Sequence, residues 1–266
     1  MSISLVLQGP VYPYTNDIVS SYLRHPIVGE VIISCWTTCP DLNVKDSRLK
    51  YVRSEDVKYS GIGNINRQLV SSLAGVKDAS IEYCAKMRTD QWISQESLTM
   101  MDKFFNKFSV PEIHFEDGTG PTANIMVAGM YTRFPFHPRD HIFWGMKTDL
   151  LKLLNIPLCN FNKEVPDAVV GTDEYFQQVL RPETYIGAYY YSKFNKSILK
   201  FLREPAKYLM DFAPEKEEAM TIYNKLRDKV FKVLPRIEFS WPKHNLKTYH
   251  YDVGQSFSEY WYEQPW

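Results

Sequence analysis

The chain has 266 residues, enough to bury the core of one large α/β domain or of one domain with an accessory subdomain. Its 31 basic and 31 acidic residues balance, which excludes a general positive field for nucleic acid, so we expect no nucleic-acid partner. No segment reaches the roughly 18 apolar residues of a membrane helix, and the N-terminal run Ile3 to Leu7 lacks a preceding basic region. A cytoplasmic protein is therefore expected.

The first half of the sequence alternates strand-like runs with helix-like segments. Strands are expected at Ile3 to Leu7, Val31 to Ile33, Leu49 to Val52 and Tyr83 to Met87. Helices are expected from Thr15 or Asn16 to about Arg24, from Asn64 to Leu73 and from Ser94 to Phe108. This alternation predicts parallel neighbours in a doubly wound sheet with helices on both faces.

The pattern changes after Val110. Short runs broken by glycine between His114 and Tyr131, and a strand-like stretch from Phe134 to Met146, predict antiparallel strands that cover the ligand edge of the sheet. Further helices are expected to begin at Thr148, at Thr172 or Asp173, and at Pro182. A charged amphipathic helix from Glu215 to Val233 fits a packed surface helix better than peripheral membrane contact, and an irregular aromatic segment follows to Trp266.

Charged side chains gather where the fourth expected strand ends. Lys86 and Arg88 share one face of an extended strand, and Asp90 shares it if the extension continues. Two cations at a strand end suit a phosphorylated ligand, and Asp90 would then hold a divalent metal that bridges the phosphates. An internal ion pair between Arg88 and Asp90 is the alternative.

Polar residues at two other strand ends and at one helix start are further candidates for binding a nucleotide diphosphate. They are Gln8, Gly9, Pro10, Ser34, Trp36, Asn64, Asn66 and Arg67. A base and ribose could lie against the Trp36 ring, while the helix start could present amide and guanidinium donors to phosphate. The alternatives are ordinary turns after the strands and a helix with a solvated polar face.

Two later carboxylates are candidates for acid–base chemistry. Asp140 precedes an aromatic strand-like run, and Glu183 lies at a helix start, where it would either stabilise the helix terminus or face a ligand as a general base. The sequence contains no nucleophilic serine elbow, Walker loop or dinucleotide glycine fingerprint. These absences weigh against a hydrolase, a kinase and a dehydrogenase.

Six blocks, in order over roughly residues 1 to 190, resemble the WavE-type lipopolysaccharide-synthesis family of glycosyltransferases. The blocks are ISLVLQGPV (Ile3 to Val11), EVIISCWTT (Glu30 to Thr38), NINRQLVSSLAGV (Asn64 to Val76), AKMRTDQ (Ala85 to Gln91), FPFHPRDHIFWG (Phe134 to Gly145) and RPETYIGAYY (Arg181 to Tyr190). Their combination is more specific than any single block.

The resemblance implies a GT-A-like fold, a Rossmann-type mixed sheet flanked by helices. The transferase core would cover residues 1–190, and a helical and aromatic extension would cover residues 191–266. The implied donor site consists of Gln8, Gly9, Pro10, Ser34, Trp36, Asn64, Asn66, Arg67, Lys86 and Arg88. Asp90 would bind Mn²⁺ or Mg²⁺ through a DxD-like motif, although Arg88-Thr89-Asp90 has one carboxylate where that motif has two.

The predicted function is transfer of a sugar from a nucleotide-diphosphate donor to a hydroxyl of a glycan or lipid-linked saccharide, with the protein in the cytoplasm or at the cytoplasmic membrane face. Glu183 is the first candidate for the general base, and Asp140 is the second. A nucleotidyltransferase is an alternative enzyme class, but Gln8-Gly9-Pro10-Val11 is not a glycine-rich phosphate loop. The non-enzymatic alternative is a glycan-binding or assembly protein on a degenerate transferase fold.

Overall fold

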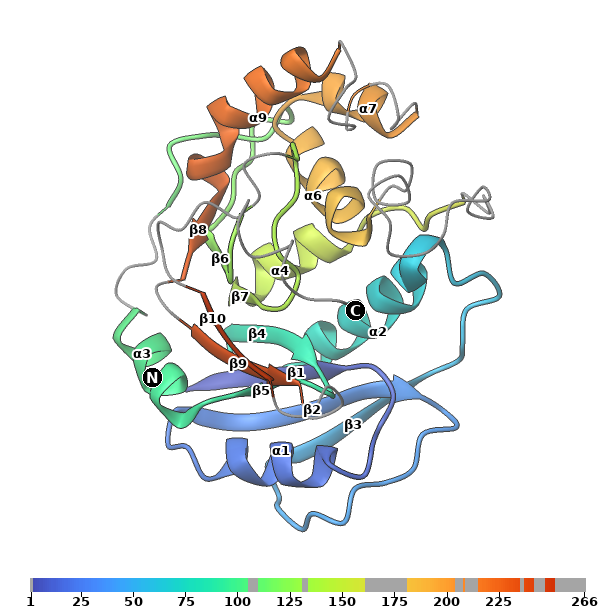
Figure 1. The fold of residues 1–266 in the computed structure, drawn as a ribbon, viewed down its shortest axis with the longest axis vertical. Coiled ribbons are helices and arrows are strands. Elements are labelled where there is room, and N and C mark those ends of the chain that lie inside the picture. The colour runs from blue at the N-terminus through green and yellow to red at the C-terminus, as the bar shows by residue number, and fades with distance from the viewer. Residues whose placement is uncertain are drawn as a thin grey trace.

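A seven-stranded mixed sheet forms the centre of the computed structural model, which describes residues 2–104, 110–130, 134–160, 181–203, 208, 215–234, 237–241 and 247–251 (Figure 1). In sheet order the strands are β3 (Leu49–Ser54), β2 (Val28–Trp36), β1 (Ile3–Gln8), β4 (Tyr83–Arg88), β7 (Phe143–Met146), β6 (Ile125–Val127) and β8 (Phe231–Val233). The first four are parallel to one another, and β7 runs antiparallel to both β4 and β6. The predicted α/β fold class, a mixed sheet flanked by helices, is confirmed.

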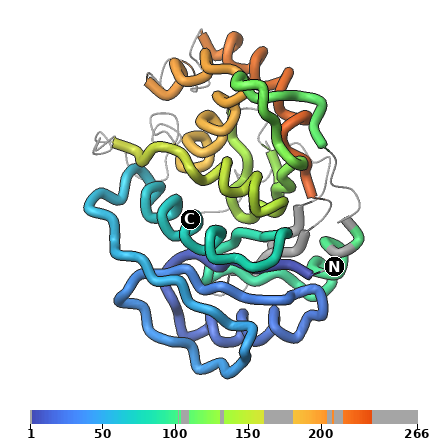
Figure 2. The backbone as a smooth tube through the Cα atoms, turned by 180° about the vertical axis from the view of Figure 1, so that it is seen from behind, coloured from blue at the N-terminus to red at the C-terminus, as the bar shows by residue number. Residues whose placement is uncertain are grey.

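Helices cover both faces of this sheet. One face carries α1 (Thr15–Leu23) and α3 (Gln95–Phe104), and the other carries α2 (Ile65–Asp78), α4 (Lys147–Leu154), α6 (Pro182–Ser192) and α9 (Lys216–Val230). Shorter helices are η1 (Ile62–Asn64), η3 (Lys196–Ile198) and α7 (Leu199–Arg203). Seen from behind, α2 lies between the blue strands and the yellow-green α4 (Figure 2). No helix of the described residues is long and apolar enough to cross a membrane.

Alternation along β1 assigns its side chains to the two faces. All six residues of β1 are buried, as in a parallel sheet that helices cover on both sides. Leu5 and Leu7 pack in the cluster that contains Ile18 of α1, whereas Val6 packs in the cluster that contains Leu69 of α2. Polar side chains on the Val6 side of β1 and its neighbours therefore face α2.

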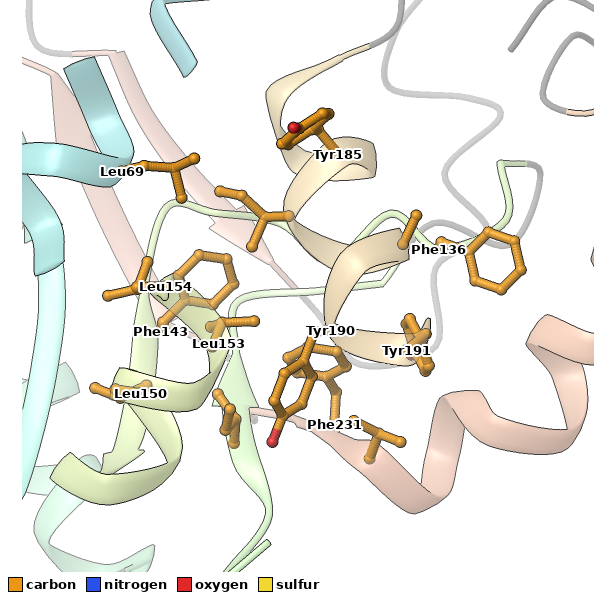
Figure 3. Packing of buried hydrophobic residues seen from close by; sticks show 14 of the residues in the cluster. Leu69, Phe136, Phe143, Leu150, Leu153, Leu154, Tyr185, Tyr190, Tyr191 and Phe231 are labelled. Atoms are coloured by element: carbon orange, nitrogen blue, oxygen red, sulfur yellow. The ribbon is translucent and has the colours of Figure 1, made fainter. Parts of the chain in front are cut away.

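Aromatic rings anchor α6 in the core (Figure 3). The ring of Tyr191 on α6 lies 5.6 Å from that of Phe136 and 5.5 Å from that of Phe231, between ring centroids. The ring of Tyr190 lies 5.7 Å from the same Phe231. Because these side chains are buried, the position of α6 is fixed by packing on two separate segments.

Several expectations for the second half were wrong. The strands β6 and β7 do not cover the ligand edge of the sheet. They extend the sheet beyond β4, because β7 pairs with the otherwise open edge of β4 and β6 pairs with β7. Residues 134–142 are not a strand, and α4 has no side-chain cap because its N-cap residue is Met146 rather than Thr148. Thr172 and Asp173 lie outside the described residues.

The last part of the chain also differs from its expected form. The helix α9 ends at Val230 because the next three residues, β8, pair in parallel with β6. Beyond it, β9 (Ile237–Trp241) and β10 (Lys247–Tyr251) form an antiparallel hairpin, where an irregular segment was expected. Strand β9 also pairs with β5 (Trp92–Ile93), in a second sheet of three strands.

Candidate functional site

Three polar side chains form a row at the carboxyl ends of the parallel strands. Gln8 at the end of β1 is in register with Ser34 of β2 on one side and with Arg88 of β4 on the other. The chain proceeds from β1 to β2 and β3 on one side, and then adds β4 on the opposite side of β1. Ligands of open α/β sheets bind outside the carboxyl ends at this change of direction, so Gln8 and Arg88 flank the expected ligand position.

A group of charged side chains, which we call the charged cluster, lies on the α2 side of this edge. Its members are Lys86, Arg88, Asp140, His141 and Glu183, whose charges act on one another. Lys86 is fully buried, and its Nζ donates to the Asp140 carbonyl oxygen at 3.1 Å and lies 3.9 Å from Asp140 Oδ2. The structure therefore brings together both predicted acid–base residues and both predicted strand-end cations.

The two carboxylates of the charged cluster have pKa values that are displaced in opposite directions. Burial, and next the charge of Asp140, raise the pKa of Glu183 to about 7. Burial alone would raise the pKa of Asp140 as well, but Lys86 and His141 hold it below its ordinary value. Burial lowers the pKa of Lys86 itself. One carboxylate thus stays ionised while the other can gain or lose a proton near neutral pH, which is the usual division between acid–base partners.

Contacts at the first turn of α6 hold Glu183 in place. Pro182 begins the helix, as predicted. His137 Nδ1 and Thr184 Oγ1 share a hydrogen bond of 2.8 Å, which ties the segment before Asp140 to the residue after Glu183. Burial lowers the pKa of His137 well below its ordinary value, so this imidazole is neutral.

Arg88 and Asp90 form the internal ion pair that the sequence left as an alternative. Arg88 Nε donates to Asp90 Oδ1 at 2.7 Å, and Arg88 Nη2 donates to Asp90 Oδ2 at 2.6 Å. Both carboxylate oxygens are therefore engaged by a guanidinium. Within the described residues, no group of three or more His, Cys, Asp or Glu side chains is placed to hold a metal ion. The side chains around Asp90 do not fit a divalent cation in this arrangement.

The loop after β1 is tied to the loop after β4. Thr89 Oγ1, in the loop after β4, donates to the Pro10 carbonyl in the loop after β1 at 2.6 Å. The Gly9 amide of the same loop after β1 donates to the carbonyl of Ser34 in β2 at 3.1 Å. Gly9 has a φ of +123°, which an L-residue rarely adopts, and a Cβ there would lie 3.2 Å from Thr89 Oγ1. Trp36, the last residue of β2, is partly exposed beside this edge. The backbone of both loops is thus held close together at the expected ligand position.

Two predicted donor-site residues hold α2 in place. Ser34 Oγ donates to the Ser71 carbonyl at 2.6 Å, and Ser71 Oγ in turn donates to Gln8 Oε1 at 3.1 Å. Asn66 Nδ2 donates to the carbonyl oxygens of Tyr59 and Cys159, while Asn66 Oδ1 accepts from the Cys159 amide at 2.6 Å. Ser34 and Asn66 are therefore buried inside the protein, each with hydrogen-bond partners of its own.

The two remaining candidates lie on the exposed start of α2. Arg67 pairs with Asp56 through two hydrogen bonds of 2.9 and 2.6 Å, and its Nη1 donates to Asn64 Oδ1 at 3.3 Å. Asn64 has a left-handed backbone with a φ of 62°. No hydrogen bond between described residues joins Asn64 or Arg67 to the charged cluster, in contrast to Gln68, whose Nε2 donates to Asp140 Oδ2.

Asn66→Ala is expected to lower the free energy of unfolding by about 2–4 kcal/mol, because it leaves the Cys159 amide and carbonyl without their buried partner. Urea denaturation measures the change. Asn64→Gly, which suits the left-handed backbone, is the control and should stay close to wild type. A variant of Asn66 with unchanged stability but weakened ligand binding would instead assign Asn66 to the donor site.

Sequence reasoning placed Gln68 in the polar group at the start of α2, as a possible phosphate-binding amide, and it missed His141 and Gln91. The contact of Gln68 with Asp140 and the position of His141 beside Lys86 and Arg88 could not be predicted, because both join residues that are distant along the chain. The Gln91 side chain is fully buried, and neither its Nε2 nor its Oε1 has a hydrogen-bond partner among the described residues. The Tyr14 hydroxyl, on the loop after β1, is also buried without a hydrogen-bond partner in the part of the chain that the structure describes. Buried amides are nearly always paired, so the Gln91 amide is a notable exception.

Gln91→Met is expected to raise the free energy of unfolding by about 1–3 kcal/mol, because a thioether of similar shape replaces an amide that is buried without partners. Thermal and urea denaturation of the two proteins without ligand test this. A variant less stable than wild type would show that the Gln91 amide makes a favourable interaction in the free protein.

Residues 3–180 match the family described as WavE lipopolysaccharide synthesis. The chain belongs to the WavE family. The resemblance seen in the sequence is thereby confirmed, and all the candidate residues except Glu183 lie inside the matched range of this WavE-family chain. No curated protein sequence matches the chain.

Solved structures show weaker similarity to the WavE-family chain. TarS of S. aureus is 15% identical, with a TM-score of 0.39, over 73% of this chain and 34% of TarS. TarS residues 1–349 in complex with UDP-GlcNAc give 18% identity and a TM-score of 0.28, over 50% of this chain and 38% of that one. HddC from Yersinia pseudotuberculosis gives 10% identity and a TM-score of 0.33, over 57% and 79%. This chain thus spans only about a third of TarS.

Proposed function

We propose that this WavE-family protein is a glycosyltransferase that moves a sugar from a nucleotide-diphosphate donor to a hydroxyl of a glycan or lipid-linked saccharide. The observation that carries the proposal is the charged cluster at the carboxyl edge of the sheet, beside the change of direction between β1 and β4. It combines a cation for a departing diphosphate with two carboxylates of separated pKa. Membership of a lipopolysaccharide-synthesis family supports the choice of glycan chemistry.

In the proposed reaction, Glu183 accepts the proton of the acceptor hydroxyl while the acceptor oxygen forms a bond to the anomeric carbon. The bond between that carbon and the diphosphate oxygen breaks, and the electron pair leaves with the diphosphate. Arg88 stabilises the negative charge that develops there. A pKa of about 7 suits Glu183 to this role, because a general base works best near the operating pH. Gln8, Gly9 and Trp36 are proposed to contact the nucleotide from the neighbouring strand ends.

The first test is a thermal-shift screen of the purified protein against nucleoside diphosphates and nucleotide sugars, with Mn²⁺, with Mg²⁺ and with chelator. One nucleotide should raise the melting temperature through preferential binding to the folded state. The matching nucleotide sugar should then release its nucleoside diphosphate when acceptor glycans are added. Absence of any shift across the whole panel would contradict the proposal.

The second candidate function, a glycan-binding or assembly protein, is favoured by the Arg88–Asp90 pair. This pair engages the one carboxylate that a DxD-like metal site would use. A non-catalytic protein would bind glycan fragments in a glycan array and release no nucleoside diphosphate from any donor. Measured turnover excludes it.

A further inference from the structure

The two halves of the Arg88–Asp90 pair differ in their exposure. The Asp90 side chain is 4% exposed, whereas the Arg88 side chain is 47% exposed. Asp90 is therefore the buried residue of the pair, and Arg88 is the residue whose side chain is exposed to solvent. Arg88 lies at the end of β4 in register with Gln8, beside the change of direction between β1 and β4 where ligands of open α/β sheets bind.

The surroundings of Asp90 disfavour a divalent cation. Mn²⁺ and Mg²⁺ bind through carboxylate oxygens, and both oxygens of Asp90 already accept short hydrogen bonds from a guanidinium. A metal ion would have to displace Arg88 and then lie next to its positive charge, with the buried Lys86 a further cation on the same strand. Coulomb repulsion from both cations acts against this exchange.

The same pairing leaves Arg88 prepared for an anion. Asp90 uses Nε and Nη2, and Nη1 makes no hydrogen bond within the part of the chain that is described. A guanidinium held on one edge by a carboxylate keeps a fixed orientation and presents its other donors in the planar arrangement that matches phosphate oxygens. Tyr12 and Tyr14, stacked with ring centroids 5.1 Å apart, come from the adjacent loop after β1.

We infer that Asp90 is a positioning residue that fixes Arg88 for the diphosphate of the donor, and that this chain binds the diphosphate without a divalent metal at Asp90. The inference rests on the proposed function. It assigns to an arginine the charge neutralisation that the DxD-like interpretation assigned to a metal. If Arg88 neutralises the diphosphate, no second carboxylate is needed to bind a metal, which agrees with the single carboxylate in Arg88-Thr89-Asp90.

Calorimetric titrations of UDP, GDP and inorganic pyrophosphate into the full chain, in EDTA and in Mn²⁺, test the inference. At least one of these probes should bind in EDTA, and Mn²⁺ should change its Kd by less than about threefold, since the binding charge is the guanidinium. Arg88→Ala and Asp90→Ala should each weaken binding by about tenfold or more, as expected for loss of a charged hydrogen bond or of its orientation.

A double-mutant cycle separates positioning from an independent role. Once Arg88 is absent, Asp90 has nothing to orient, so Arg88→Ala combined with Asp90→Ala should bind about as weakly as Arg88→Ala alone. Asp90→Asn preserves the shape of the side chain and one acceptor oxygen, and it should bind more tightly than Asp90→Ala. It also provides a variant of similar size if Asp90→Ala does not fold.

Three results would overturn the inference, and they differ in what they mean for the proposed function. Binding that requires Mn²⁺ and is lost in Asp90→Ala would make Asp90 a metal ligand. Losses of binding free energy that add in the double variant would make Asp90 an independent contact. Neither result would contradict the proposed donor site. No binding of UDP, GDP or pyrophosphate in either condition would overturn both the inference and the proposed donor site.

Discussion

Glu183→Gln is expected to lower the rate of sugar transfer by about two to four powers of ten and to leave donor binding close to that of wild type. The amide cannot accept the proton of the acceptor hydroxyl, and general-base catalysis contributes about that factor. In the wild type, the rate should rise with pH up to about 7, where Glu183 loses its proton, and then level off. Initial rates between pH 5 and 9 measure both effects.

The same substitution should stabilise the protein at alkaline pH. The folded-state pKa of Glu183 lies above its ordinary value of 4.5, so the wild type loses stability as the pH rises from about 4.5 to about 7. Glutamine carries no charge, so it avoids this loss of stability, which is on the order of 3 kcal/mol above pH 7 and near zero at pH 4. Thermal denaturation of both proteins at pH 4 and pH 8 measures it.

The control is Glu217→Gln, on an exposed position in the first turn of α9, whose effect on stability should be small at either pH. Wild-type transfer rates in Glu183→Gln would remove Glu183 from the base role. A variant that is inactive and also destabilised at pH 8 would indicate a structural role for Glu183.

Gly187→Ala is expected to lower the free energy of unfolding by about 3 kcal/mol and to reduce transfer even where the protein remains folded. A Cβ at this position of α6 would overlap the Phe136 carbonyl oxygen and lie 2.6 Å from Pro138 Cδ. The helix can relieve the overlap only by moving away from the segment that leads to Asp140. Because Glu183 is one turn earlier on the same helix, the distance between the two carboxylates would change.

Gly145→Ala is the matched control for this prediction. It is the same chemical change in β7, but its added Cβ would have its nearest neighbours at 3.7 Å, which is ordinary van der Waals contact. Melting temperatures and initial rates of the two variants should therefore differ clearly. Equal stability of both variants would show that α6 is not held against Phe136 as the structure places it.

Local patterns were sufficient to predict the first half of the sheet and the start of α6. Short, largely apolar runs located β1 and β2, because a strand buried on both faces is apolar along most of its length. Pro182 located the start of α6, because proline suits the first helical turn. Alternation also placed Lys86 and Arg88 on one face of β4.

Contacts between distant segments were beyond those patterns. Gln68 and Asp140 are 72 positions apart, and nothing in the periodicity of α2 indicates that one donates to the other. The buried position of Asn66 likewise depends on Cys159, which is 93 positions away. For Asp90, the same residues satisfy either an ion pair or a metal site, and only the geometry of the loop distinguishes them.

The pairing of β6 with β8 has a consequence for how the protein folds. The far edge of the main sheet is closed by residues that follow β6 much later in the chain, after α4, α6 and α9. Closing such a long loop costs entropy before any contact repays it, so this edge should form late. During synthesis, β6 would remain an open edge until residues 231–233 leave the ribosome. Association with other nascent chains would be most probable in the period before these residues pair with β6.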